Sequence, residues 1–496
     1  MILLALAGIW ITTAYWQTNK PLPPGAHVDS PWYPIDARDV TFIADITSAD
    51  AYGRPSVSQA IFDQVLGVVR SARKFVVLDY FLFNSQLLTG TGLRPISGEL
   101  RDALIECRRA NPGLQVLLIT DPINDAYGGA ASGDLRLLRA AGVGIAVTDL
   151  DRLRDSNYLY SSLWRLGIKW WSGSGQASYN RQETEADPAS GSPWPNPLNE
   201  SESPLTFRAW SRLLNFKANH RKLVIADDGH DGMVAIVGSA NPHDASSTHS
   251  NTALKLTGPA IWPLLKSELD IARFSGWQGQ LDAAGERGDP APGPASSDGR
   301  VRVLTEGAIR AELLNQLDGT VRGDNIDIAT FYVADRGIVA SLLAASRRGV
   351  AVRLILDPNK DAYGQARTGI PNQPVASELV AKSDGAIHVR WYRTHGEQFN
   401  TDLAMVYGPQ RLWLTVGSAY LTRRDLDDYN LEADIVVEVP RGSPLAVQTL
   451  EYFETLWSNR AGLGIEYTAD FGYYADPSQL HYWLYRVMEG TGVSTF

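Results

Sequence analysis

The chain has 496 residues, of which 44% are hydrophobic and 20% charged. These fractions exclude a disordered protein, and the length allows two or more hydrophobic cores. The net charge of −10 argues against a nucleic-acid partner, because Lys and Arg bind most of the phosphates in such complexes. The one cysteine, Cys107, excludes an internal disulfide and a cysteine-bound metal cluster.

Residues 1–19 are the most apolar segment of the chain. The apolar run is slightly shorter than the roughly 20 residues that span a bilayer, and Trp10, Tyr15 and Trp16 suit a membrane interface. We predict an uncleaved N-terminal membrane anchor with the soluble body outside the cytoplasm. A cleaved secretion signal and a buried helix or strand are the alternatives. Residues 20–40, rich in proline, are expected to form an extended spacer.

Two parts of the chain repeat one pattern. An apolar strand ends in the turn D-P-x-x-D-A-Y-G at Asp121 and again at Asp357, and a later strand ends in G-S-A at Gly238 and again at Gly417. Strands alternating with helices indicate an α/β sheet in each half. We predict an internal duplication. Strands are expected at 75–83 and 327–333, helices at 97–110 and 338–348, lobes at 41–275 and 300–462, and a Gly- and Pro-rich linker at 276–299.

The first half is longer because it carries an insert at about residues 155–216. The insert is rich in Trp, Ser, Gly and Pro, and it forms either a lip for an acyl chain or membrane, or a surface flap with its own small core. The C-terminal tail, 463–496, has enough aromatic residues to fold back on the body. The tryptophans of the insert are Trp164, Trp170, Trp171, Trp194 and Trp210.

One polar motif follows the insert. It reads H-x-K-x4-D from His220 through Lys222 to Asp227, and then G-S-x-N through Ser239 to Asn241. Side chains alternate along a strand, so His220 and Lys222 share one face. The pattern and spacing resemble the phospholipase D superfamily. The resemblance implies two similar α/β lobes, each a mixed sheet flanked by helices, packed as a pseudo-dimer with one site between them and no metal or cofactor.

The resemblance also implies roles for these residues. His220 would attack phosphorus and form a covalent intermediate, while Lys222 and Asn241, with Ser239 as a weaker candidate, would stabilise the phosphate oxygens. Asp227 would support the motif rather than touch substrate. Ser418 is the counterpart of Ser239 in the second half.

The second copy of the motif is degenerate. Aligned on the G-S-A turns, Asn400, Asp402 and Tyr420 replace the His, Lys and Asn of the first copy. In the family the second histidine is the usual general acid, and losing such a group typically costs about 10²–10⁴ in rate. An alternative register through His395 keeps a histidine but loses the match of the following strand. Glu432 is a candidate to orient the first-motif histidine across the lobe interface.

The sequence therefore predicts a phospholipid phosphodiesterase or phosphatidyltransferase that works through a phosphohistidine and is impaired by loss of the second motif. A catalytically inactive relative that binds lipid phosphate or a partner is one alternative, and a nuclease of the superfamily is another. The expected state is a monomeric pseudo-dimer with a phospholipid or other phosphodiester as its substrate.

Overall fold

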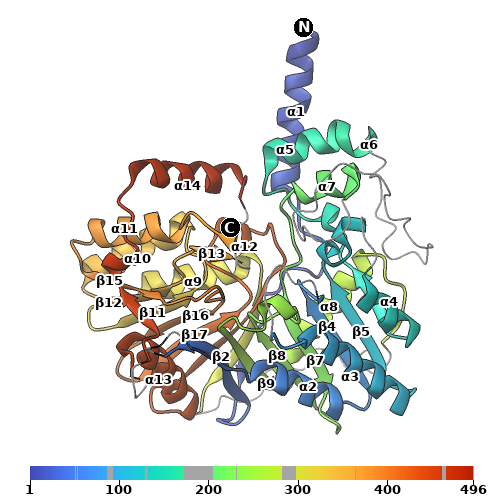
Figure 1. Ribbon diagram of the computed structural model, residues 1–496, viewed down its shortest axis with the longest axis horizontal. Coiled ribbons are helices and arrows are strands. Elements are labelled where there is room, and N and C mark those ends of the chain that lie inside the picture. The colour runs from blue at the N-terminus through green and yellow to red at the C-terminus, as the bar shows by residue number, and fades with distance from the viewer. Residues whose placement is uncertain are drawn as a thin grey trace.

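The computed structural model describes residues 1–50, 52, 54–85, 93–128, 132–171, 205–230, 232–281, 298–362, 365–460, 465–494 and 496. It forms two lobes side by side, each a mixed β-sheet flanked by helices (Figure 1). This is the predicted fold class.

The first lobe has an eight-stranded sheet in the order β3-β2-β9-β8-β7-β4-β5-β6. Its central strands are apolar and β-branched, and they are buried on both faces, as sheets covered by helices require. The strands are β2 (Val40–Ala49), β3 (Pro55–Ser58), β4 (Phe75–Tyr80), β5 (Gln115–Thr120), β6 (Gly144–Val147), β7 (Lys222–Asp227), β8 (Met233–Gly238) and β9 (Asn251–Thr257). The helices are α2 (Ile61–Ser71), α3 (Ile96–Ala110), α4 (Gly133–Ala140) and α8 (Trp262–Phe274).

The second lobe has a nine-stranded sheet in the order β1-β10-β18-β17-β16-β11-β12-β15-β19. The strands are β1 (Tyr33–Pro34), β10 (Arg300–Thr305), β11 (Asn325–Thr330), β12 (Ala351–Leu356), β15 (Ile387–Tyr392), β16 (Asp402–Tyr407), β17 (Arg411–Gly417), β18 (Ala433–Pro440) and β19 (Thr468–Asp470), and β13 (Asp361–Ala362) pairs separately with β14 (Gln365–Ala366). The helices are α9 (Gly307–Gly319), α10 (Arg336–Arg348), α11 (Asn372–Lys382), α12 (Arg423–Leu426), α13 (Pro444–Ser458) and α14 (Gln479–Thr491).

The two sheets share one topology. The run β2-β9-β8-β7-β4-β5-β6 corresponds strand for strand to β10-β18-β17-β16-β11-β12-β15. In both runs the last three strands are parallel and the others pair antiparallel. The repeated strands and helices expected from the sequence become β4 and β11, and α3 and α10. The shared order is what an internal duplication would leave.

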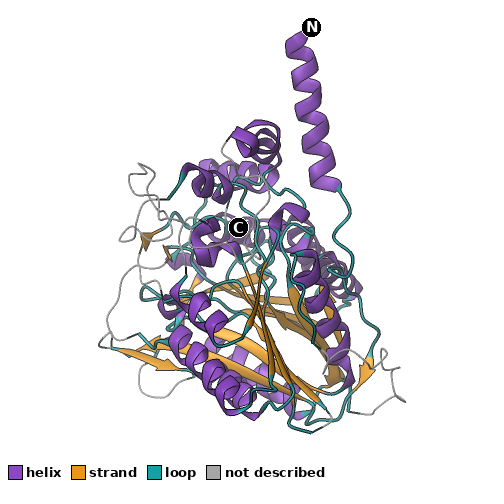
Figure 2. Ribbon diagram, turned by 90° about the vertical axis from the view of Figure 1, so that its right-hand side faces the viewer, coloured by secondary structure: helices purple, strands orange, loops and turns teal. Residues whose placement is uncertain are grey.

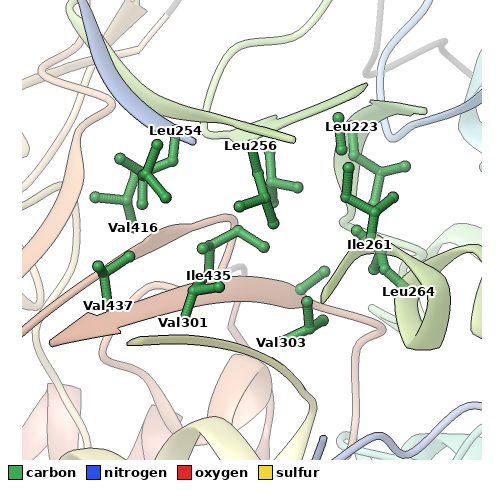
Figure 3. Close-up of a cluster of buried hydrophobic side chains, with 14 of the residues drawn as sticks. Leu223, Leu254, Leu256, Ile261, Leu264, Val301, Val303, Val416, Ile435 and Val437 are labelled. Atoms are coloured by element: carbon green, nitrogen blue, oxygen red, sulfur yellow. The ribbon is translucent and has the colours of Figure 1, made fainter. Parts of the chain in front are cut away.

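The lobes meet through the inner faces of the sheets. Buried side chains from β8, β9, β17 and β18 belong to one hydrophobic cluster, which helices α8 and α13 extend on either side. Figure 3 shows Leu254 and Leu256 of the first sheet facing Val416 and Ile435 of the second. Each lobe has a further core of its own beneath its outer helices. The interface is therefore a core rather than a loose contact between domains.

A buried arginine crosses this interface. The side chain of Arg221 is fully buried, and its guanidinium donates to Glu268 of α8 at 2.8 Å and to Glu306 of the second lobe at 2.6 Å. It also donates to the backbone oxygens of Ala26 at 3.0 Å and Glu432 at 3.2 Å. One side chain thus ties the motif strand to the other lobe.

Two N-terminal expectations change. Residues 20–40 pack against the body instead of forming a separate spacer. Tyr33–Pro34 add a strand to the second sheet. Ala26 is buried, and its carbonyl accepts hydrogen bonds from Arg221 and Thr305. The apolar segment forms α1 (Ile2–Asn19), which projects from the body (Figures 1 and 2). In the described part of the chain no helix, α1 included, is long and apolar enough to cross a membrane, and the predicted anchor is not supported.

The described parts of the insert are helical. They form α5 (Tyr158–Leu163), which continues through Trp164–Ile168 into α6 (Lys169–Trp171), and α7 (Phe207–Leu213). Trp164 is buried and Trp170 is exposed. Residue Trp194 and the rest of 172–204 lie outside the described residues, as does the side chain of Trp171. The tail folds back as expected, adding β19 to the second sheet and packing α14 beside α11 (Figure 1).

We expect Arg221→Met to lower the free energy of unfolding by about 3–5 kcal/mol, because it leaves two buried carboxylates without their cation. The midpoint of urea unfolding, followed by tryptophan fluorescence, measures the change. Arg411→Met is the matched control: Arg411 pairs with Glu438 at 2.6 Å but is 55% exposed, so its loss should cost at most about 1 kcal/mol. Equal effects of the two substitutions would contradict the interpretation that Arg221 stabilises the contact between the lobes.

Candidate functional site

The site lies where the first motif meets the second lobe. His220 directly precedes β7, and its Nδ1 is 2.8 Å from Glu432 Oε1, just before β18. The backbone N–H of His220 donates to the carbonyl of Leu431 at 2.9 Å. The contact between His220 and Glu432 that the sequence suggested is therefore present, and backbone pairing fixes it.

The contacts of His220 determine its tautomer. Lys222 Nζ lies 2.9 Å from His220 Nε2, and an ammonium group can only donate. Nε2 must then accept, so Nδ1 carries the proton and donates to Glu432. Burial, reinforced by the charge of Lys222, lowers the pKa of His220 to about 3. Burial also lowers the pKa of Lys222 to about 8, although nearby carboxylates, Glu432 first, oppose this. The imidazole is neutral at ordinary pH, as a nucleophile must be.

The repeated turns hold both motifs in place. Asp121, the first residue of the first turn, accepts the backbone N–H of Asn219 at 2.7 Å, and Asp357 accepts that of Phe399 at 2.8 Å. Each residue so held directly precedes the motif position of its lobe. Each also pairs with the other lobe, Asn219 with Leu431 and Phe399 with Ser250. The sequence analysis found the turns but did not assign their first aspartates this function.

Aromatic rings enclose His220 on two sides. The ring centroids of Phe81 and Tyr420 lie 5.0 and 5.2 Å from that of His220. The Nζ of Lys222 is 5.8 Å from the centre of the Tyr420 ring. Asn241, the amide of the intact motif, accepts the backbone N–H of Leu82 with its side-chain oxygen at 3.1 Å. Tyr420 thus stands beside the histidine and lysine where the intact motif has an amide.

The degenerate residues satisfy one another. Asn400 donates to the carbonyl of Ser239 at 2.8 Å and to Asn251 Oδ1 at 2.9 Å. Its own side-chain oxygen accepts the hydroxyl of Tyr420. Asn400 therefore occupies the position symmetric to His220 but forms part of a closed hydrogen-bond network between the lobes.

Several carboxyl groups surround the lysine. Burial raises the pKa of Glu432 to about 8 and that of Asp425 to about 7. Burial, followed by repulsion from Asp434, raises the pKa of Asp402 well above its ordinary value. One Asp402 oxygen is buried without a hydrogen-bond partner among the described residues. Where the intact motif has a lysine, the second half-site presents a carboxyl group that favours its neutral form.

Within the described residues, one group of side chains has the spacing of a metal site. The donor atoms of His220, Asp425 and Glu432 lie within 4.8 Å of one another. The ammonium group of Lys222, 2.9 Å from the imidazole, would repel a cation placed there. The charges of the site therefore suit an anion better than a metal ion.

The remaining predicted residues support the site or lie away from it. Asp227 is at the far end of β7, where it accepts backbone N–H groups including those of Lys74 at 2.7 Å and Phe75 at 2.9 Å. The hydroxyl of Ser239 donates to Asn251 Oδ1 at 3.3 Å, and that of Ser418 donates to Glu432. His395 is 35% exposed, and its Nδ1 lies 3.7 Å from Glu397 of its own loop.

Sequence reasoning missed three residues of the site. Asp425 lies close to Glu432 and His220, and Arg221 ties the motif to the other lobe. Arg424 is buried, and its Nε and one Nη have no hydrogen-bond partner in the described part of the chain. The dipeptide Arg424-Asp425 follows the second G-S-A turn by only a few residues, and this proximity was the one available signal.

The chain has two lobes of similar topology with the candidate site between them. Residues 313–457 match the family model described as cardiolipin synthase, PLD-like domain. No curated protein sequence matches the chain. Over these residues the chain is therefore similar to a phospholipase D-like family. The matched segment lies in the second lobe, the one with the degenerate motif.

Comparison with solved structures gives a similar fold for phosphatidylserine synthase. Phosphatidylserine synthase of Haemophilus influenzae Rd KW20 aligns over 96% of each chain with a TM-score of 0.55 and 11% identity. Polyphosphate kinase from Porphyromonas gingivalis has a TM-score of 0.45 and 12% identity, over 94% of this chain and 57% of that one. Nuc, a phospholipase D family member from Salmonella typhimurium, has a TM-score of 0.25 and 19% identity, over 34% of this chain and 97% of that one.

We expect His220 to be neutral and protonated on Nδ1 at pH 6, where an ordinary histidine with a pKa near 6.5 is mostly charged. Nitrogen-15 NMR of the imidazole distinguishes the tautomers, and His220→Ala identifies the signal. Lys222→Met should raise the pKa of His220, because it removes a neighbouring positive charge. A His220 that titrates near pH 6.5 in the unaltered protein would contradict this assignment.

Proposed function

We propose that the protein acts on the phosphodiester group of phospholipids, with His220 as the nucleophile. The observation that carries the proposal is the contact of His220 with Glu432 of the other lobe, with Lys222 beside Nε2. Glu432 accepts from Nδ1 and so orients the imidazole, and in its ionised form it stabilises the positive charge that develops on attack. A phosphodiester is the anion that such a neutral imidazole next to a cation would accept.

The proposed reaction has two steps. The lone pair of His220 Nε2 attacks phosphorus, the new N–P bond forms, and the P–O bond to the leaving alcohol breaks with the electron pair on oxygen. Lys222 leaves Nε2 and binds a phosphate oxygen, and the buried Arg424 adds positive charge nearby. The oxygen of water or of a second alcohol then attacks phosphorus, and the N–P bond breaks with its electron pair returning to Nε2. The proton lost by the attacking O–H balances the one gained by the alkoxide of the first step, giving hydrolysis with water and phosphatidyl transfer with an alcohol.

The proposed site is half-intact. The leaving alkoxide needs a proton, and Asn400 in the position of a second histidine cannot supply one. Tyr420 further narrows the space beside the nucleophile. We therefore propose fast reaction only for substrates whose leaving group needs no proton, and slow turnover of natural alkyl esters.

The lipid class of the substrate is part of the proposal. The similar proteins are a cardiolipin synthase family and a phosphatidylserine synthase, and both names denote enzymes of phospholipid metabolism. We extend this class to the present chain and propose that it works at a membrane. The net charge of −10 makes a nuclease role the weaker one.

A second candidate function is binding of a lipid phosphate without turnover. The observation that favours it is the closed network of Asn400, Tyr420 and Asn251, in which the replaced residues satisfy one another. Such a site would keep the anion-binding cations Lys222 and Arg424 without completing the chemistry.

We expect His220 to form a covalent phosphorus adduct when the protein is exposed to a nitrophenyl phosphodiester, because nitrophenolate leaves without a proton. Intact mass and peptide mapping would locate the adduct. The adduct should be absent in His220→Ala and retained in His249→Ala, a matched change at another buried histidine. A substrate that binds but leaves no adduct on the unaltered chain would remove His220 as the nucleophile and favour the binding function.

Restoring the second motif should restore turnover. The triple change Asn400→His, Asp402→Lys, Tyr420→Asn is expected to raise hydrolysis of a phospholipid with an alkyl headgroup by about 10²–10⁴, through the regained acid. Release of the headgroup alcohol measures the rate. Adding His220→Ala should abolish the gain, since both histidines must act on one phosphate.

A control in the unaltered chain tests the alternative register. If His395 already served as the acid, His395→Ala would lose activity and the triple variant would gain little. A folded triple variant without gain, together with an unaffected His395→Ala, would favour binding without turnover.

A further inference from the structure

Helix α14 carries a row of apolar side chains on its outward face, in addition to the residues that pack against the second lobe. Tyr485 and Glu489 are buried against the second lobe, whereas Leu480, Trp483, Leu484 and Val487 are 44–74% exposed. The exposed residues recur at a spacing of three and four, which places them on one face of the helix. A surface helix normally directs such a stripe inward. This one presents it to the outside.

The insert repeats the arrangement in the other lobe. Along the helical stretch from α5 to α6, Leu159, Leu163, Leu166 and Trp170 recur at spacings of four, three and four and are 39–72% exposed. Two helices far apart in the sequence therefore each carry an outward apolar stripe. Single exposed leucines are ordinary, but aligned rows of them mark an interaction surface.

Both helices lie at the end of the molecule from which α1 projects (Figures 1 and 2). Helix α1 contacts α5, and Trp10 donates from its indole nitrogen to the carbonyl of Leu159 at 3.2 Å. Apart from the half-buried Trp10, its large apolar residues from Met1 to Trp16 are exposed. Most of the exposed large apolar side chains in the described part of the chain belong to these three helical stretches.

The charged residues of these helices are mostly basic. In α1, α5–α6, α7 and α14 the one acidic residue is Glu489, which is buried. Of the basic residues, Arg165, Lys169 and Arg212 pair with Asp155 or Asp151, which precede α5. Arg208 and Arg486 are the other two, and both are half-buried. An apolar end without an exposed carboxylate on its helices is complementary to an anionic lipid surface.

We propose that α1, the α5–α6 stretch and α14 form a docking surface for a bilayer that contains anionic phospholipid. Exposed apolar residues on three separate helices at one end suit the broad apolar boundary of a bilayer better than a protein partner of limited area. Tryptophans at positions 10, 16, 170 and 483 suit the headgroup level of a membrane. The helices would lie in the interface, with their apolar side chains among the lipid tails.

A row of aromatic rings links the site to the residues that follow α14. The ring of Tyr420, beside His220, is 5.8 Å from that of Tyr332, and the Tyr332 ring is 6.0 Å from that of Phe496. Phe496 follows α14 in the chain and is buried in the core of the second lobe. Docking itself does not depend on the chemistry of His220.

The test is sedimentation of the full chain with vesicles of phosphatidylglycerol and phosphatidylcholine, compared with vesicles of phosphatidylcholine alone. We expect binding to the anionic vesicles to weaken about tenfold or more in Trp483→Glu/Val487→Glu and in Leu163→Glu/Leu166→Glu. Because these side chains are exposed, the urea midpoint should not change. The matched control is Val321→Glu/Val447→Glu, which alters residues 62% and 43% exposed outside the three helical stretches and should bind as the unaltered chain does.

Three results would overturn the proposal. The first is unchanged vesicle binding by both variants, and the second is equal binding to the two kinds of vesicle. The third is a dimer in analytical ultracentrifugation that the variants dissociate without any vesicle binding, which would assign the surface to a second copy of the chain. His220→Ala should bind vesicles normally. Loss of the adduct chemistry alone would therefore count against the proposed function and not against docking.

Discussion

The buried guanidinium of Arg221 is the constraint on which the site depends. A fully buried cation is tolerated only where its charge and its donors are satisfied. Here the partners come from α8, from Glu306 of the second lobe and from two backbone carbonyls. Because one carbonyl belongs to Glu432, the same arginine fixes the residue that contacts the neighbouring His220. The geometry of the site is thus set by an ion pair that takes no part in its chemistry.

The two half-sites show how a symmetric scaffold can diverge. Both keep the aspartate that holds the motif, Asp121 or Asp357, and both keep the backbone pairing to the other lobe. The reactive positions differ: one half has His220 and Lys222, the other Asn400 and Asp402. The hydrogen bonds from these aspartates go to backbone groups, so they do not depend on which side chains stand at the reactive positions. The result is one shared site with Lys222 on one side and carboxyl groups on the other.

The buried carboxyl groups of Glu432, Asp425 and Asp402 influence the net charge of the site. Burial raises the pKa of Glu432 and Asp425 into the neutral range and that of Asp402 well above its ordinary value. Carboxyl groups in such a cluster shed charge by retaining protons. The net potential near Lys222 therefore depends on pH more than in a site built from two lysines. An anion bound in the site would meet Lys222 and the two Arg424 nitrogens that have no hydrogen-bond partner among the described residues.

The sequence by itself determined the local elements, the repeated pattern and the candidate residues. Apolar runs and helical spacing placed β4, β11, α3 and α10, because burial and periodicity are local properties. Motif spacing placed His220 and Lys222 on one strand face, and alignment of the G-S-A turns suggested Glu432 as the partner. The spacing of these residues could be examined without knowing how the lobes pack.

Only the tertiary structure decided what comes together from distant parts of the chain. The packing of Arg221 against Glu306, the closed network of Asn400 and Tyr420, and the burial of residues near Ala26 all depend on how one lobe sits on the other. The outward position of the apolar rows on α5 and α14 also depends on packing. Helical spacing shows that an apolar face exists, but which side of the helix meets the core is settled by packing.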